Sequence, residues 1–230
     1  MSAPVLTIDG PSGSGKGTIS RLVAARLGWH LLDSGALYRI VALAGQRASL
    51  PADDEASHAQ LAGTMQVRFG TTPDGGEQVL LGDPPVEVTA AIRSEEAGQG
   101  ASRVAVWPLV RAALLDRQHA FARPPGLVAD GRDMGTVVFP AADLKIFLTA
   151  SPEERAQRRY KQLKDKGSGA SLAALSLEIA ERDRRDSTRA VAPLRPAADA
   201  IVIDSTGIPI GAVVDQVLAQ LRERGLSPAK

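Results

Sequence analysis

The chain has 230 residues, enough for one sizeable hydrophobic core with short insertions. Lys and Arg total 27 while Asp and Glu total 26, so no global basic field favours nucleic acid or an anionic membrane, and any polyphosphate site must be local. The absence of Cys excludes disulfides, thiolate chemistry and Cys-ligated zinc, and the three His show no metal-ligand spacing.

Short apolar runs alternate with segments of helical period along the chain. The predicted strands are 5–8, 30–32, 127–129, 144–148 and 200–203, and the predicted helices are 17–27, 35–47, 103–122, 152–166 and 210–224. Continuous apolarity is typical of strands covered on both faces. The alternation therefore predicts an α/β fold, with a five-stranded, mainly parallel sheet flanked by helices. Ligands of such sheets bind at the carboxyl ends of the strands, and we expect four strand ends on this edge: Asp9-Gly10, Asp33-Ser34, Asp130-Gly131 and Asp204-Ser205.

Two stretches depart from this alternation. Residues 63–92 hold three short apolar segments separated by turn-rich sequence at 71–76 and 82–84, which predicts a small antiparallel β insertion. Residues 152–190 are rich in charge and of helical character, with a Gly-Ser-Gly turn at 167–169. We expect this second stretch to form a helical hairpin that closes over the ligand edge of the sheet as a lid.

The strongest motif is a P-loop between the first predicted strand and the first predicted helix. Its glycines let successive backbone N–H groups face phosphate oxygens, and the helix N-terminus adds partial positive charge. Lys16 can then reach the β- and γ-phosphates. The strand–loop–helix context disfavours a glycine-rich turn with a chance lysine. Gly17 stands where Ser or Thr usually follows the lysine, which displaces the hydroxyl to Thr18. The expected ATP-binding residues are Gly10, Pro11, Ser12, Gly13, Ser14, Gly15, Lys16, Gly17 and Thr18.

A second set of phosphate-sized cations would separate a kinase from other P-loop proteins. Arginine clamps phosphate through its planar fork, but Arg39 and Arg111 could equally be solvated surface charges. Arg132 differs because it lies in a glycine-flanked loop at a predicted strand end. Asp130 and Asp133 could form turns or cap helices, and Asp130 could instead hold metal-bound water.

The segment 181–189 is rich in arginine, and its cations outnumber its carboxylates. The alternative is a salt-bridged, solvent-exposed helix face. Phosphoryl transfer spreads negative charge over the transferring oxygens, so we expect Arg182 and Arg185 to act in catalysis with Lys16 and Arg132. No general base is needed, because the second pKa of a phosphate monoester is about 6. Steps of three and four residues place on one helix face Arg182, Arg185, Asp186 and Arg189.

Six segments in order resemble the bacterial-type cytidylate kinases, a family of P-loop nucleoside monophosphate kinases. They are 8–18, 29–39, 128–140, 144–148, 181–194 and 198–206, so the resemblance covers nearly the whole chain. It implies transfer of the γ-phosphoryl group of ATP to CMP or dCMP with Mg²⁺. The implied domains are a core of 1–62, 103–151 and 191–230, a nucleoside-monophosphate-binding insertion at 63–102 and a lid at 152–190.

The resemblance also implies site residues. Ser34, Arg39 and Arg132 would lie near the CMP phosphate, and Ser102, Arg111 and Asp133 would face cytosine. Asp186 and Arg189 would reach the sugar. Gly98 and Gly100 are weak helix formers, which leaves the placement of Ser102 open. We expect no direct magnesium ligand, with contacts through water from Thr18, Asp33 and Asp130.

Two other readings stay open at this point. One is a different small P-loop kinase that acts on adenylate, another monophosphate or a hydroxy acid such as shikimate. The other is a nucleotide-dependent switch or a nucleic-acid-binding ATPase, although aromatic residues make up only 3% and offer few stacking platforms. Neither a signal peptide nor a membrane-spanning run of about 20 apolar residues is visible, so we expect a cytoplasmic protein, and we expect a monomer.

Overall fold

The computed structural model describes residues 3–72, 77–165 and 171–226. Within these residues, no helix is both long and apolar enough to cross a membrane. The chain divides into two compact units. Met1–Asp33 and His119–Lys230 form the first, which we call the P-loop unit, and Ser34–Gln118 form the second, which we call the inserted unit.

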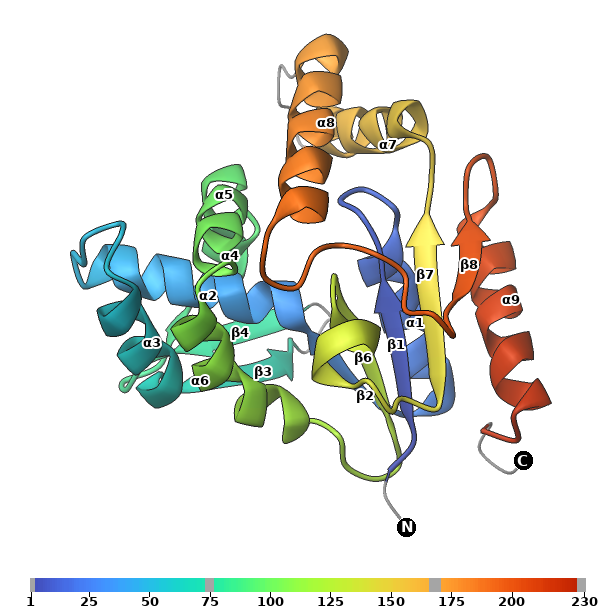
Figure 1. Cartoon of the computed structure of the whole chain (residues 1–230), viewed down its shortest axis with the longest axis horizontal. Helices are drawn as coiled ribbons and strands as arrows, with labels where there is room; N and C mark the ends of the chain where they lie inside the picture. The colour runs from blue at the N-terminus through green and yellow to red at the C-terminus, as the bar shows by residue number, and fades with distance from the viewer. Residues whose placement is uncertain (1–2, 73–76, 166–170, 227–230) are drawn as a thin grey trace. The chain divides into compact units, whose positions relative to one another are not determined.

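The P-loop unit is built on a five-stranded sheet with the strand order β2-β6-β1-β7-β8 (Figure 1). Each neighbouring pair is parallel, so the carboxyl ends of all five strands meet at one edge, as the sequence predicts. The register places Asp9 beside Gly131 and Asp33 beside Asp130 at that edge. The strands are β1 (Val5–Asp9), β2 (His30–Asp33), β6 (Leu127–Gly131), β7 (Leu144–Thr149) and β8 (Ile201–Asp204).

Two helices share the hydrophobic core of this unit with the sheet. They are α1 (Lys16–Leu27) and α9 (Ile210–Glu223), which pack against each other and against the strands. The core is formed by fully buried side chains such as Leu6 and Ile8 of β1, Val23 of α1 and Val214 of α9. Every residue of β1 is buried, which explains why its apolar residues do not alternate with exposed polar ones.

Two helices form a hairpin beyond the carboxyl ends of the strands (Figure 1). They are α7 (Pro152–Asp165) and α8 (Leu172–Thr188), and we call the pair the lid hairpin. The predicted turn at 167–169 lies outside the described residues. Because α8 ends at Thr188, Arg189 follows the helix in extended backbone and does not continue the predicted helix face. A short π-helix, η1 (Met134–Val138), follows β6 and contacts β1.

The inserted unit combines helices with the predicted antiparallel sheet, whose strand order is β3-β4-β5. The predicted turn at 71–76 falls largely on residues 73–76, which lie outside the described part of the chain. The elements are α2 (Ser34–Arg47), α3 (Glu55–Thr64), β3 (Val67–Thr71), β4 (Glu77–Leu81), β5 (Val86–Glu87), α4 (Thr89–Ile92), α5 (Glu95–Val104) and α6 (Pro108–His119).

The prediction of one helix over 103–122 is wrong. Two helices occupy this region, because α5 ends at Val104 and Pro108, which lacks a backbone N–H donor, begins a new helix. Helix α5 starts earlier than expected, and Ser94 caps it by accepting a hydrogen bond from the Ala97 N–H at 3.1 Å. Helix α3 was not predicted, since its buried side chains are the short Ala62 and the polar His58.

The two weak helix formers of α5 allow it to pack closely on α2. A Cβ atom at Gly98 would lie 3.2 Å from a guanidinium nitrogen of Arg39, and one at Gly100 would lie 2.8 Å from the Cβ atom of Ala42. A side chain at Gly100 would push the helices apart, while one at Gly98 would require the Arg39 guanidinium to shift. Tertiary packing therefore outweighs helix propensity in α5.

Candidate nucleotide site

The P-loop connects the carboxyl end of β1 to the first turn of α1. Gly10 leaves no room for a side chain, because a Cβ atom there would collide with the carbonyl oxygen of Leu148. Gly15 has a φ of 90°, in the left-handed region that favours glycine, and it directly precedes α1. The Nζ atom of Lys16 donates to the carbonyl oxygen of Pro11 at 3.1 Å, so the side chain folds back over the loop. These features produce an anion cradle at a helix N-terminus.

The structure explains why glycine follows the P-loop lysine. A Cβ atom at Gly17 would lie 3.1 Å from the Oδ2 atom of Asp130 at the end of β6. A serine at this position would crowd the carboxylate. The close approach of the buried Asp130 therefore favours glycine at this position, and the next hydroxyl group is that of Thr18.

The charged groups around Lys16 shift one another's pKa values. Burial lowers the pKa of Lys16 and the positive charge of Arg132 lowers it further, against the carboxylate of Asp130. Burial raises the pKa of Asp130, against the attraction of Lys16. Arg182 also lowers the pKa of Lys16, and Asp33 acts in the opposite direction. The P-loop lysine thus shares its surroundings with two arginines from other elements, as a polyphosphate site requires.

Arg132 and Asp186 link the loop after β6 to the lid hairpin. The Nε atom of Arg132 donates to the Oδ2 atom of Asp186 at 2.9 Å, and the two side chains are 18% and 8% exposed. Burial alone would raise the pKa of Asp186, but Arg132, followed by Arg189 and Arg182, holds this pKa below its usual value. The structure therefore brings four of the sequence-predicted residues together.

Arg185 lies elsewhere on the same helix. Its side chain is 42% exposed, and its Nε atom is 3.7 Å from a carboxylate oxygen of Glu181. Asp133, in contrast, is buried at the N-terminus of η1, and its carbonyl oxygen accepts the N–H groups of Val137 at 2.9 Å and Val138 at 3.2 Å. Arg185, which was predicted to act in catalysis, is thus exposed, whereas Asp133, which was predicted to face cytosine, is buried.

Arg155 of α7 fastens the lid hairpin to the P-loop. Its buried guanidinium donates from Nη1 to the carbonyl oxygen of Ser12 at 3.1 Å and from Nε to that of Ala150 at 3.0 Å. The same group forms a two-point ion pair with Asp183 of α8. One side chain therefore holds both helices of the hairpin and the phosphate loop together.

A cavity of about 630 Å³ lies beside the P-loop, between α7 and the segment that follows β8. Arg158 spans it: Nη1 donates to the carbonyl oxygen of Ser14 at 3.2 Å and Nη2 to that of Ser205 at 2.6 Å. The lining residues are Gly13, Ser14, Gly15, Thr18, Ile19, Glu154, Arg158, Arg159, Gln162, Ser205, Gly207, Ile208, Pro209, Ile210 and Val213. Its apolar wall at 208–213 and polar rim suit a heterocyclic base attached to a phosphate chain.

The other sequence-predicted residues belong to the inserted unit. Ser34 is buried at the start of α2. Arg39 donates from Nη1 to the carbonyl oxygens of Ile92 at 2.8 Å and Ser94 at 3.1 Å. The hydroxyl of Ser102 donates to the Gly98 carbonyl oxygen at 3.2 Å. The two Arg39 bonds connect α2 to the end of α4 and to the cap of α5, while the Ser102 bond stays within α5.

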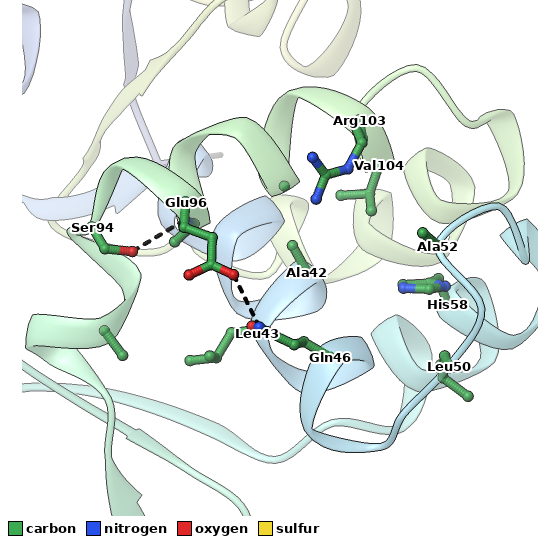
Figure 2. A pocket seen from close by; sticks show the side chains of 13 residues that line it. Ala42, Leu43, Gln46, Leu50, Ala52, His58, Ser94, Glu96, Arg103 and Val104 are labelled. Atoms are coloured by element: carbon green, nitrogen blue, oxygen red, sulfur yellow. Dashed lines mark hydrogen bonds between the residues drawn. The ribbon is translucent and has the colours of Figure 1, made fainter.

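Arg111 lies in the first turn of α6 and is half-buried. Its Nη1 atom donates to the carbonyl oxygen of Ala105 at 3.2 Å, and its guanidinium carbon lies 6.0 Å from the ring centre of Tyr38. Nearby, a cavity of about 390 Å³ opens between α2, α3 and α5, with Arg103, Glu96 and His58 around it (Figure 2). Arg111 is not among the residues that line this cavity.

Residues 6–223 match the family model described as cytidylate kinase. The chain belongs to the cytidylate kinase family. The cytidylate kinase of Shewanella loihica is 56% identical over 222 residues, covering 96% of each chain. That of Pseudomonas syringae pv. syringae is 56% identical over 228 residues, covering 99% of each chain. Among solved structures, a gluconokinase from Sinorhizobium meliloti 1021 aligns with 16% identity and a TM-score of 0.48 over 96% of this chain and 92% of that one.

Some site residues of this cytidylate kinase family member were missed by sequence reasoning. Arg155 and Arg158 appear in the sequence merely as two cations in a charged helix, because their carbonyl partners are 143 and 144 residues away. Ser205 was expected at the ligand edge, but the rest of the cavity beside the P-loop was missed, since its wall comes from the weakly patterned segment after β8. A Ser-Thr-Gly sequence directly after a strand, at 205–207, was the available signal.

Proposed function

We propose that this chain transfers the γ-phosphoryl group of ATP to CMP or dCMP, giving ADP and CDP or dCDP. The observation that carries this conclusion is the match of residues 6–223 to the cytidylate kinase family. The P-loop and the cations grouped around Lys16 support it, because they supply the anion site that a nucleoside monophosphate kinase needs.

On the donor side, the P-loop amides and Lys16 bind the β- and γ-phosphates of ATP. The adenine base enters the cavity beside Arg158, with the apolar segment 208–213 on its other side. Arg155 keeps the lid hairpin on the loop so that water is excluded from the transferring phosphoryl group.

On the acceptor side, Arg132 binds the phosphate of CMP, and with Arg182 it neutralises the charge that builds up between the two nucleotides. The phosphate oxygen of CMP attacks the γ-phosphorus directly, because a phosphate monoester is largely ionised at neutral pH. Catalysis then depends on positioning and charge neutralisation rather than on a general base. The assignments of the CMP-binding residues rest on the resemblance and are Ser34, Arg39, Ser102, Arg111, Arg132, Asp133, Asp186 and Arg189.

Magnesium fits this site through water molecules. Asp33, the last residue of β2, lies beside Asp130, the penultimate residue of β6, and both carboxylates act on Lys16. Among the described residues, no three His, Asp or Glu side chains gather into a group that could hold a metal ion directly. We assign Asp33, Asp130 and Thr18 to hydrogen bonds with metal-bound water, because Mg²⁺ usually keeps several of its waters. When bound, Mg²⁺ shields the charge of the ATP phosphates.

An acceptor panel tests the proposed function. CMP, dCMP, UMP, AMP and shikimate would each be offered with ATP and Mg²⁺, and ADP release measured. We expect kcat/KM for CMP or dCMP to exceed that for AMP and shikimate by about 100-fold or more, since base recognition through buried polar groups gives this order of discrimination. Equal turnover of another acceptor would reject the assignment. Stimulation of ATP hydrolysis by single-stranded DNA, without any effect of CMP, would favour a nucleic-acid-dependent ATPase.

The division into core, insertion and lid, the monomeric state and the cytoplasmic location stay predictions. Sedimentation equilibrium of the purified chain checks the monomer directly.

A further inference from the structure

Asp9 is the last residue of β1 and directly precedes the P-loop. It is 4% exposed. Its Oδ1 atom accepts the N–H group of Met134 at 2.9 Å, and its Oδ2 atom accepts that of Gly135 at 2.8 Å. These two residues begin η1, immediately after Arg132 and Asp133. One carboxylate therefore connects the start of the P-loop to the loop that carries two proposed CMP-binding residues.

The two hydrogen bonds to Asp9 restrict the loop after β6 more than one bond would. A single hydrogen bond would fix the distance of the loop from β1 but leave it free to rotate about that bond. Two bonds from adjacent N–H groups to the two oxygens of one carboxylate fix the distance and the orientation together. Among the common side chains, an ionised Asp or Glu offers two acceptor oxygens without a donor. An asparagine would place an NH₂ group against one of the two N–H groups.

The backbone on either side strengthens this connection. Asp9 lies beside Gly131 in the register of β1 and β6, so the loops that follow these two strands begin side by side at the edge of the sheet. Gly135 packs tightly, since a Cβ atom there would lie 2.9 Å from the hydroxyl oxygen of Thr7. The first turn of η1 is thus held against β1 by a close backbone approach and by the carboxylate.

The position costs free energy, which points to a requirement beyond packing. Burial raises the pKa of Asp9 to about 6 in spite of the two N–H donors. The negative charges of Asp133 and Asp130 oppose ionisation of Asp9, while Lys16 favours it. A buried carboxylate that is partly protonated near pH 6 is an expensive way to satisfy two amides.

We propose that Asp9 is a positioning residue that holds Arg132 and Asp133 in register with the P-loop, so that the acceptor nucleotide meets the donor at the correct place. The proposal rests on the proposed function, because it assumes that the loop after β6 binds the acceptor. Asp9 touches neither nucleotide in this scheme and acts through the main chain of Met134 and Gly135.

The test is the variant Asp9→Asn, assayed with ATP and CMP varied separately. We expect KM for CMP to rise about 10-fold and kcat to fall about 10-fold, the size of effect that losing one hydrogen bond to a charged group produces. The dissociation constant of ATP should change less than about 2-fold, because the P-loop backbone keeps its glycines and Lys16. If Asp9 only stabilised the fold, the variant would weaken the binding of ATP and of CMP to a similar extent.

Asp143→Asn is the matched control. Asp143 accepts the N–H group of Val5 at 2.8 Å, which is the same kind of bond at the opposite end of the same strand. This variant should have the same KM for CMP, the same kcat and the same dissociation constant for ATP as the wild type. Parallel changes for ATP and CMP in Asp9→Asn, or a CMP-specific loss in Asp143→Asn, would overturn the proposal. Failure of the proposed function itself would appear separately, as a wild-type chain that does not phosphorylate CMP.

A second measurement keeps the proposal testable should Asp9→Asn fail to fold. Amide hydrogen exchange of the wild type would be followed with CMP, with ATP and with neither. We expect CMP to slow exchange at Met134 and Gly135 about 10-fold more than at Val5, because CMP stabilises the positioned loop. Equal slowing at all three amides would overturn the proposal.

Discussion

Arg132 and Asp186 form a hydrogen bond of 2.9 Å although they are 54 residues apart in the sequence. The bond joins the loop after β6 to the end of α8 and is largely buried. It keeps the guanidinium in a fixed orientation and holds the pKa of Asp186 below its usual value despite burial. The acceptor cation that we assign to the CMP phosphate is therefore preorganised by a carboxylate from the lid hairpin.

Arg132→Ala should impair the use of CMP and spare ATP. We expect KM for CMP to rise about 30-fold or more, since a charged hydrogen bond to phosphate contributes on the order of 2 kcal/mol. The variant should also lose about 2 kcal/mol of stability, because Asp186 stays buried without its partner. Isothermal titration with each nucleotide and urea unfolding check both effects.

The double variant Arg132→Ala with Asp186→Asn separates these two effects. Stability should recover, since no uncompensated carboxylate is left, while the CMP defect should persist. Loss of ATP affinity with an unchanged KM for CMP would move Arg132 to the donor side.

Lys16→Ala should abolish transfer and leave the fold intact. The lysine donates to the Pro11 carbonyl oxygen, and its burial disfavours its charge, so its removal should change the melting temperature little. We expect kcat to fall about 1,000-fold, which is typical for the loss of a phosphate-neutralising cation. Circular dichroism and a coupled ADP assay suffice. Lys161→Ala, on the exposed side of α7, is the control, and retention of a tenth of the activity in Lys16→Ala would contradict the role.

Asp133→Ala should weaken the preference for cytosine over uracil. Cytosine presents an amino group as a hydrogen-bond donor where uracil presents a carbonyl, so a carboxylate favours cytosine. The ratio of kcat/KM for CMP to that for UMP should fall about 10-fold, which corresponds to about 1.4 kcal/mol. An unchanged ratio would place base recognition elsewhere in the chain.

The sheet and the P-loop could be predicted because their signals are local. Five apolar runs mark the five strands. In the nine residues from Gly10 to Thr18, the glycines themselves indicate the backbone conformation of the loop. The break between α5 and α6 was missed, although Pro108 marks it, because the flanking residues keep a helical period. Gly98 and Gly100 suggested a poor helix, and the reason they are tolerated lies on α2, far away in the sequence.

The same distinction holds for the site. Arg132 could be recognised from its glycine-flanked loop, and the resemblance placed Asp186 at the site, but the bond between the two could not be predicted, since no local pattern links them. The helix-face argument for the segment 181–189 assumed a helix through Arg189, whereas α8 ends at Thr188. Arg185 points toward Glu181, one turn earlier, an ordinary ion pair that the count of charges could not exclude. Contacts between distant segments decide which cations face the P-loop.

Arg155→Ala should weaken ATP binding more than CMP binding. The variant removes the bond to the Ser12 carbonyl oxygen and the ion pair with Asp183, so the lid hairpin loses its connection to the P-loop. We expect KM for ATP to rise about 10-fold and KM for CMP to change less than about 2-fold. Arg184→Ala is the control, because Arg184 is exposed and pairs with Glu181 on its own helix. An equal effect of both variants would contradict the role of Arg155.

The buried carboxylate of Asp9 should make stability fall as the pH rises. Its pKa is about 6 in the folded protein, against an ordinary value of 3.8, so the native state binds the proton more tightly than the unfolded state. The stabilising contribution is complete below about pH 3.8 and is lost as the pH rises through about 6. At about 1.4 kcal/mol per pKa unit, the full effect is on the order of 3 kcal/mol.

Urea unfolding of the wild type and of Asp9→Asn at pH 5, 6 and 7 measures this contribution. The wild type should gain roughly 1 to 2 kcal/mol relative to the variant between pH 7 and pH 5, because only the wild type takes up a proton at position 9. The charge of Asp9 also raises the pKa of Asp130, so the comparison measures the protonation of Asp9 together with this coupling. If the difference in unfolding free energy between wild type and variant stayed constant with pH, the pKa of Asp9 would not be raised in the folded protein. The argument that this buried carboxylate costs free energy would then be wrong.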